Sequence, residues 1–261
     1  MSLVRAAAKG LFVAVDLLLP TRRGPRVLIY HCVGLNTGRQ MEVSVDDFEW
    51  QMKWLAEHRE VVSLDTALER WYEPDSDRLV VLTFDDGYRS VHQNAFPTLT
   101  ALRFPFVIYL STGLLERGRD DSDVAAVEWR SVLQMLESGL LTVGSHTHNH
   151  SDLRHLDSHA IEEELRISDG LIAERLGVRV EHFAYPWGYW SPEGDRIVRS
   201  RYATAALGSP GMRSSTSHDQ HLMHRFPIQL SDGRLWFSGR LKRGLVMEEE
   251  VRRRLRGYAG P

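Results

Sequence analysis

The sequence contains a single cysteine, Cys32, among its 261 residues. One cysteine excludes an intrachain disulfide framework and a cysteine-rich zinc module. Basic residues are not in excess either, because 32 Lys and Arg against 35 Asp and Glu give a formal net charge of −3. The chain therefore lacks the global positive charge with which proteins bind nucleic acid through its phosphates, and we expect no nucleic-acid partner.

A long uninterrupted apolar run is also absent. The most apolar stretch, residues 3–19, carries Asp16, whereas a membrane-spanning helix needs about 20 apolar residues. Its apolar residues fall on one helical face, so we expect an N-terminal amphipathic helix and lead-in over residues 1–24. Packing on the domain is the simplest role for this helix, and contact with a membrane surface or an atypical export signal are alternatives. We expect a protein that is cytoplasmic or peripheral at the membrane, with an exported form not excluded.

After this segment, short apolar runs alternate with stretches of helical periodicity. The clearest strand candidates lie at 78–84 and 106–110, and the best helix candidate lies at 158–176. Strands that alternate with helices are typical of a parallel sheet with covered faces. About seven such units without a linker predict a single α/β domain, a distorted (β/α)7-type barrel over residues 25–241. A C-terminal helix and tail over residues 242–261 would follow.

Two adjacent carboxylates, Asp85 and Asp86, follow the apolar run at 78–84 and precede Gly87. Carboxylates at the end of a buried run are costly unless they are ion-paired or bind a metal. Neighbouring side chains of an extended chain point to opposite sides, so the two aspartates must take different roles. A polar turn is the alternative, since Asp-Gly is a common turn dipeptide.

Three histidines, His146, His148 and His150, follow the short strand predicted at 141–144. His146 and His150 are four residues apart, so one helical turn would place both on one face, at a spacing that lets two imidazoles chelate one ion. His148 would then point away. Two histidines, one carboxylate from the aspartate pair and open water positions would make a catalytic metal site, with a solvated histidine-rich loop as the alternative.

An aromatic turn, Tyr185-Pro186-Trp187-Gly188, follows the strand predicted at 180–184. Proline and glycine make such a turn rigid, and large flat aromatic rings stack on sugar rings as well as on protein cores. Contact with a sugar is therefore one interpretation of this turn, and core packing is the other.

Together, these motifs resemble those of the NodB-type polysaccharide deacetylases, the family 4 carbohydrate esterases. They are Thr-Phe-Asp-Asp-Gly at 83–87, His-Thr-x-x-His at 146–150 and Tyr-Pro-Trp-Gly at 185–188, in that order, within a similarity that covers roughly residues 26–230. The resemblance implies a distorted barrel that hydrolyses the N-acetyl groups of acetylated amino sugars in a glycan. It also implies one divalent metal ion, usually zinc.

The resemblance assigns roles to five residues. They are the general base Asp85, the metal ligands Asp86, His146 and His150, and Thr147, which would hold the loop. The third motif of the family often begins with an arginine that braces the catalytic aspartate, but this sequence has Ala184 there. Arg225, at the start of a late predicted strand, is our candidate for the missing arginine, and a surface ion pair is its alternative.

Amide cleavage also requires a proton for the leaving amine, which a histidine can supply. In the family this acid follows Leu-x-x on a late strand, whereas here Leu222-Met223-His224 has the wrong offset. The first strand, however, ends in Leu28-Ile29-Tyr30-His31. A barrel is closed, so a strand moved from the end of the chain to its start can occupy the same place. The chain therefore resembles a circularly permuted member with His31 as general acid and His224 in reserve, unless His31 only caps its strand or hydrogen-bonds in the core.

Two other functions stay open at this point. One is a metal-dependent hydrolase of small linear amides or cyclic imides that uses the same site. The other is a glycan-binding domain that keeps the fold without turnover. The aromatic turn favours a glycan over small amides, and the intact aspartates and histidines argue against a domain without turnover.

Overall fold

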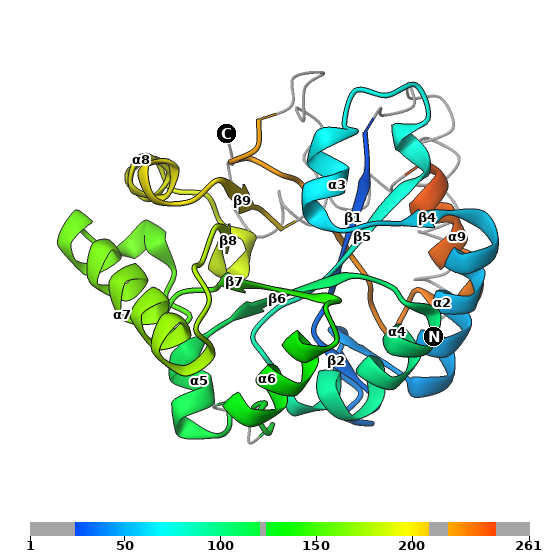
Figure 1. Cartoon of the computed structure of the whole chain (residues 1–261), viewed down its shortest axis with the longest axis horizontal. Coiled ribbons are helices and arrows are strands. Elements are labelled where there is room, and N and C mark those ends of the chain that lie inside the picture. The colour runs from blue at the N-terminus through cyan, green and yellow to red at the C-terminus, as the bar shows by residue number, and fades with distance from the viewer. Residues whose placement is uncertain (1–23, 121–123, 209–218, 244–261) are drawn as a thin grey trace.

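The computed structural model describes residues 24–120, 124–208 and 219–243. Parallel strands form one curled sheet in the order β10-β1-β5-β6-β7-β8-β9, with β4 beside β5, and β2 and β3 form a separate pair (Figure 1). The strands are β1 (Arg26–Tyr30), β2 (Cys32–Val33), β3 (Glu42–Val43), β4 (Glu60–Val61), β5 (Leu79–Phe84), β6 (Phe106–Leu110), β7 (Leu141–Ser145), β8 (His182–Ala184), β9 (Thr204–Ala206) and β10 (Phe226–Pro227). This α/β half-barrel confirms the predicted fold class.

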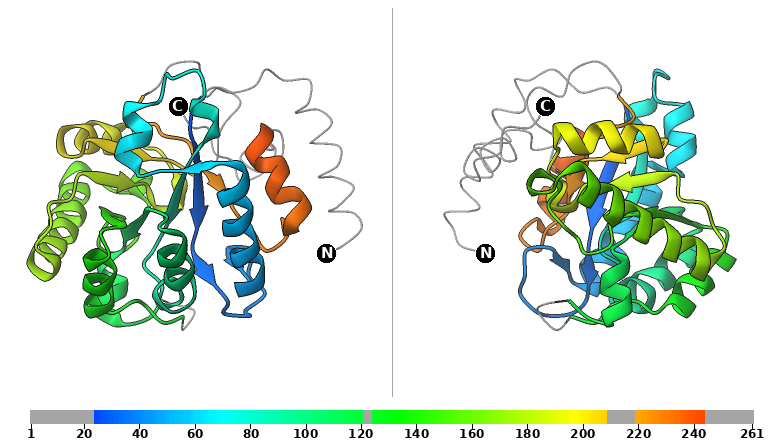
Figure 2. Two further views of the ribbon diagram at one scale, coloured as in Figure 1. Left: turned by 45° about the vertical axis from the view of Figure 1, so that its right-hand side comes forward. Right: turned by 90° about the vertical axis from the view of Figure 1, so that its left-hand side faces the viewer.

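Most helices lie on the outer side of the sheet, whereas α3 packs against its inward-pointing side chains (Figures 1 and 2). The helices are α2 (Val45–His58), α3 (Leu64–Glu69), α4 (Phe96–Leu102), α5 (Thr112–Arg117), α6 (Trp129–Glu137), α7 (Ser158–Leu176), α8 (Pro192–Arg201) and α9 (Gly233–Arg243). Local sequence sets several of their ends. The Ser44 side chain accepts the Asp47 amide at the start of α2, and Gly177 ends α7 in the left-handed conformation.

Side chains alternate along the strands and divide the core into two clusters. Val81, Val107 and Tyr109 point inward and form the smaller cluster with Leu64 of α3. Their neighbours, such as Leu82, point outward into the larger cluster beneath the helices. Burial on both faces explains why the strands have nearly continuous apolar sequences.

The last strands bring a distant segment of the chain to the carboxyl end of the sheet. The Leu207 amide donates to the Met223 carbonyl at 2.8 Å, and the Arg225 amide donates to the Gly208 carbonyl at 3.0 Å. The residues before β10 therefore run alongside the end of β9. As a result, Arg225 reaches the same edge as the motifs that follow β5 and β7.

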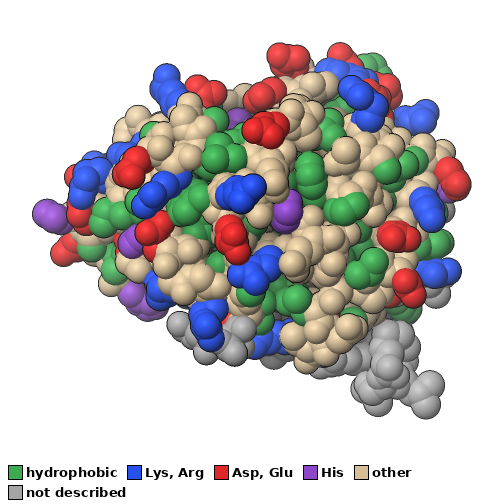
Figure 3. Space-filling model, turned by 60° about the horizontal axis from the view of Figure 1, so that its bottom comes forward, with side chains coloured by type: hydrophobic (Ala, Val, Ile, Leu, Met, Phe, Trp, Pro, Cys, Tyr) green, Lys and Arg blue, Asp and Glu red, His purple; other side chains and the backbone are tan. Residues whose placement is uncertain are grey.

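Two predicted segments fall largely outside the described residues, namely the N-terminal helix within 1–24 and the C-terminal helix and tail at 242–261. Within the described ranges, no helix is both long enough and apolar enough to cross a membrane. On the face brought forward in Figure 3, acidic, basic and hydrophobic side chains intermingle, and neither charge sign dominates a large area.

Candidate active site

Four strands deliver the candidate residues to one edge of the sheet. His31 follows β1, the two aspartates follow β5, His146 follows β7, and the aromatic turn follows β8. The Asp85 amide donates to the Tyr30 carbonyl at 3.0 Å, which continues the pairing of β1 with β5 beyond the last paired residues. Loops at the carboxyl ends of parallel strands are the usual place for chemistry in such folds.

The three predicted metal ligands converge. Asp86 Oδ1 lies 3.5 Å from His146 Nε2 and 3.3 Å from His150 Nε2. One ligand atom from each residue lies within 4.8 Å of the other two. Asp86 Oδ1 is buried and accepts no hydrogen bond of good geometry. A buried carboxylate oxygen that faces two imidazole nitrogens is the donor set of a divalent metal site, so these residues fit an ion of that kind.

The histidine loop differs from the helical turn that the spacing predicted, and that prediction is wrong. Residues 146–150 are not helical, and Thr147 and His150 have φ angles of 64° and 58°. Such left-handed residues are strained and persist where the surroundings hold them. Here the Gly113 amide donates to the His148 carbonyl at 2.7 Å, and a Cβ on Gly113 would meet that same oxygen at 2.7 Å.

His148 and Thr147 also differ in role. His148 Nδ1 lies 2.9 Å from Thr112 Oγ1, so this ring is engaged outside the metal cluster, in line with its predicted orientation. The Thr147 hydroxyl is buried and has no hydrogen-bond partner. The hydrogen bonds of Thr147 that hold the loop are therefore made by its backbone: its amide donates to Ser145 Oγ at 3.3 Å, and its carbonyl accepts the Thr112 amide at 3.3 Å.

A hydrogen bond on the side away from Asp86 sets the orientation of the His146 ring. Its Nδ1 lies 2.7 Å from the Ala184 carbonyl, so Nδ1–H donates there and Nε2 faces Asp86. Burial lowers the pKa of His146 to about 4, which keeps the ring in its neutral, ligating form near pH 7. The backbone carbonyl of Ala184 thus orients His146, a role that the type of side chain at position 184 could not indicate.

Asp85 faces a different partner from Asp86. Arg225 binds it in a bidentate pair, with Nη1 to Oδ1 at 2.6 Å and Nη2 to Oδ2 at 2.8 Å. Burial, the largest single influence, would raise the pKa of Asp85, but Arg225 together with His146 and His31 outweighs it, so the pKa lies below its usual value. The two aspartates thus have separate partners, as predicted, but the extended chain on which that prediction rested is wrong at Asp86, whose φ angle is 71°.

Arg225 is itself held at every nitrogen. Its side chain is 1% exposed, and besides Asp85 it donates to Thr83 Oγ1 at 3.1 Å and to the Leu207 carbonyl at 2.9 Å. The Tyr109 ring lies 5.1 Å from the guanidinium carbon. The structure thus places Arg225 where the bracing arginine was predicted, and Thr83 and Leu207 are contacts that sequence reasoning did not select.

His31 lies at the edge of this cluster. It is half-buried, and its charge when protonated lowers the pKa of both Asp85 and Asp86, which places it within electrostatic reach of each. The strand that carries it lies between β10 and β5, next to the strand of the aspartate pair. His224 is half-buried and directly precedes Arg225. The circular permutation and the acid role of His31 stay predictions.

The aromatic turn presents less surface than predicted. Tyr185 and Pro186 are buried, and Tyr185 belongs to the hydrophobic core, which corrects the expectation that its ring contacts a ligand. Trp187 is 63% exposed, and its ring centroid lies 4.9 Å from that of His150. Gly188 packs so closely on Gly208 that a Cβ would lie 2.4 Å from the Gly208 Cα. Of the four residues predicted to contact the substrate, Trp187 is the one whose side chain is exposed beside the metal ligands.

A family model described as polysaccharide deacetylase matches residues 72–205. The chain belongs to the polysaccharide deacetylase family. This confirms the resemblance that the three motifs predicted, and all three motifs lie within the matched range. His31 and Arg225 lie outside it, so their roles depend on the geometry of this chain alone.

Relatives and solved structures agree with the assignment to the family. A poly-beta-1,6-N-acetyl-D-glucosamine N-deacetylase of Staphylococcus aureus is 26% identical over 174 residues, which are 62% of this chain and 59% of that protein. The structure of IcaB from Ammonifex degensii superposes with a TM-score of 0.69 at 26% identity, over 87% of this chain and 98% of that one. A polysaccharide deacetylase from Bacillus cereus gives 0.69 at 25% identity, over 84% and 69%. The chain thus spans less than two thirds of the staphylococcal relative.

Proposed function

We propose that this polysaccharide deacetylase is a metal-dependent hydrolase that removes N-acetyl groups from acetylated amino sugars in a glycan. The observation that carries the proposal is the convergence of Asp86, His146 and His150 beside a second carboxylate, Asp85, which Arg225 keeps ionised. A metal site and a separate buried base are the two parts that amide hydrolysis by water requires.

Asp86, His146 and His150 would hold one divalent ion. Two imidazole nitrogens and one carboxylate oxygen are a donor set typical of catalytic zinc, and three protein ligands leave a position open. When bound, a divalent ion supplies Lewis acidity, which polarises an amide carbonyl and lowers the pKa of water towards 7. The neutral state of His146 matches this role, because a protonated imidazole cannot ligate.

Asp85 and His31 would handle the protons. Asp85 Oδ2 lies 3.9 Å from His146 Nε2, so its carboxylate borders the metal ligands without being one of them. In this position it accepts a proton from the attacking water. Its low pKa makes it a weak base, but Arg225 ensures that it is ionised and correctly oriented. His31, at the end of β1, donates a proton to the nitrogen of the leaving amino sugar.

Two observations support a sugar as the substrate. Trp187 offers an exposed aromatic ring next to His150, and such rings stack on the faces of sugars. The staphylococcal relatives are named for N-deacetylation of poly-β-1,6-N-acetyl-D-glucosamine, which favours an N-acetylglucosamine polymer here.

The test is acetate release by the metal-loaded protein from N-acetylglucosamine oligomers with β-1,6 and β-1,4 linkages. The control is Asp85→Asn, which removes the base and leaves the metal ligands in place. We expect acetate release by the wild type and little from the variant. Turnover of small amides or cyclic imides without sugars would favour the small-amide hydrolase instead. Glycan binding without acetate release from any substrate would indicate a binding domain.

A further inference from the structure

The residue before the first histidine ligand has a polar side chain that faces away from the site. Ser145 is the last residue of β7 and is fully buried. Its Oγ lies 2.9 Å from Ser168 Oγ of α7 and accepts the Thr147 amide at 3.3 Å. A serine that accepts the amide two residues later closes a tight turn, so Ser145 shapes the start of the histidine loop.

Helix α7, which carries Ser168, has a second contact, with the segment that follows α8. Tyr202 follows α8 and stacks on Phe183 with ring centroids 5.2 Å apart. The Tyr202 hydroxyl donates to Asp169 of α7 at 2.9 Å. Asp169 in turn accepts from Arg201 Nε at 2.6 Å.

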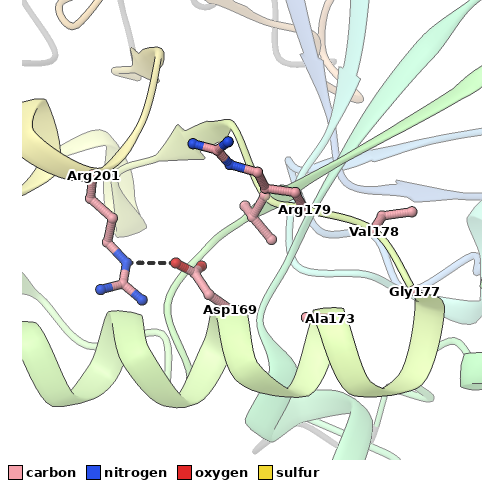
Figure 4. A pocket seen from close by; sticks show the side chains of 7 residues that line it. Asp169, Ala173, Gly177, Val178, Arg179 and Arg201 are labelled. Carbon is pink, nitrogen blue, oxygen red and sulfur yellow. Dashed lines mark hydrogen bonds and ion pairs between the residues drawn. The ribbon is translucent and has the colours of Figure 1, made fainter.

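The ion pair between Asp169 and Arg201 lies at the surface. Figure 4 shows Asp169 rising from α7 to meet Arg201, with Arg179 on the opposite side of a cleft of about 480 Å³. These hydrogen bonds fix α7, the helix that carries Ser168, against the end of α8.

The two serine hydroxyls form one buried pair. Ser145 Oγ lies within hydrogen-bond distance of Ser168 Oγ, and either oxygen can be the donor. In both cases a lone pair of Ser145 Oγ is left to accept the Thr147 amide.

We propose that Ser145 is a positioning residue for the metal-binding loop. Its hydroxyl, paired with that of Ser168, holds the Thr147 amide and so keeps His146 and His150 facing Asp86. The proposal rests on the proposed metal site and adds to it the residues that shape its loop. Two left-handed residues, Thr147 and His150, require such support.

The test compares Ser145→Ala with a matched control. Ser90 is also a buried serine whose Oγ accepts a backbone amide, that of Val33 at 3.2 Å, but it makes no contact with the histidine loop that the structure records. Residues that orient metal ligands typically contribute about 10- to 100-fold to metal affinity or activity. We therefore expect Zn²⁺, measured by competition with a chromophoric chelator, to bind about tenfold or more weakly to Ser145→Ala. Ser90→Ala should bind it like the wild type, and Ser145→Thr should restore affinity.

A second measurement needs no metal. In the metal-free protein, hydrogen exchange at the Thr147 amide should accelerate in Ser145→Ala and stay unchanged in Ser90→Ala. If the serine pair serves packing only, both alanine variants will lose similar stability, and neither Thr147 exchange nor Zn²⁺ affinity will respond to Ser145 specifically. That result would overturn the proposal. If the wild type binds no Zn²⁺, the proposed metal site fails, and Thr147 exchange still decides whether Ser145 holds the loop.

Discussion

The turn that carries Trp187 depends on a contact between two glycines, which makes Gly188→Ala an informative perturbation. Gly188 has a φ angle of 71°, and a Cβ there would lie 2.4 Å from both the Cα and the nitrogen of Gly208. The left-handed conformation alone costs an alanine about 1–2 kcal/mol. Overpacking against backbone adds about 1–3 kcal/mol. We therefore expect the free energy of unfolding to fall by about 2–5 kcal/mol.

Gly177 is the matched control for this experiment. Its φ angle is 69°, and a Cβ there would meet nothing within 4 Å. Gly177→Ala should therefore cost only the conformational part, about 1–2 kcal/mol. The difference between the two variants isolates the contact of Gly188 with Gly208.

Urea denaturation of both variants and the wild type gives the three unfolding free energies. If Gly188→Ala proves too unstable to purify, Gly208→Ala tests the same contact from the other side. Its Cβ would lie 3.1 Å from the Gly188 Cα, a milder clash that should cost about 1 kcal/mol. Equal losses in Gly188→Ala and Gly177→Ala, or no loss in Gly208→Ala, would refute the close packing of the aromatic turn.

Four further variants separate the roles within the site. Asp85→Asn should retain the metal and lose most turnover, whereas Asp86→Asn should lose metal affinity; metal content and acetate release decide, and the reverse pattern would mean that the roles are exchanged. His31→Ala should lower turnover by roughly 10²–10⁴ with normal metal content and folding, so a fully active variant would eliminate it as the acid. Arg225→Met should destabilise the fold by about 3–5 kcal/mol, because Asp85 is left buried and unpaired. It should also move the acid limb of the pH–rate profile to higher pH, since the pKa of Asp85 rises without the arginine, and an unmoved limb would contradict the pairing.

Local patterns predicted the elements that carry the site. The helix predicted at 158–176 coincides with α7, and the strand predicted at 106–110 coincides with β6. The sequence also anticipated that Asp85 and Asp86 would have different partners, although it did so by assuming an extended chain, whereas Asp86 has a left-handed φ angle of 71°. Each of these features depends on residues that are close together in the sequence, so the sequence alone is enough to predict it.

Contacts between distant segments were harder to predict. Arg225 reaches Asp85 across 140 residues, and it does so because the backbone around Met223 runs alongside the end of β9. No motif surrounds Arg225 that distinguishes it from a surface arginine. Its complete burial becomes apparent only once the curvature of the sheet is known.

The histidine ligands show how a correct pairing can follow from the wrong conformation. The amides of residues 146–150 need acceptors outside this segment, because the loop is not helical and even a single helical turn leaves its first four amides without a partner within it. The His146 amide donates to the Leu110 carbonyl at 2.9 Å, that of Thr147 to Ser145 Oγ at 3.3 Å, and that of Asn149 to Glu164 Oε2 at 2.7 Å. A spacing of four residues thus allows two imidazoles to meet, but it does not determine how the backbone between them runs. That path depends on acceptors supplied by β6, β7 and α7, and for this reason substitutions at those acceptors should alter metal binding without touching a ligand.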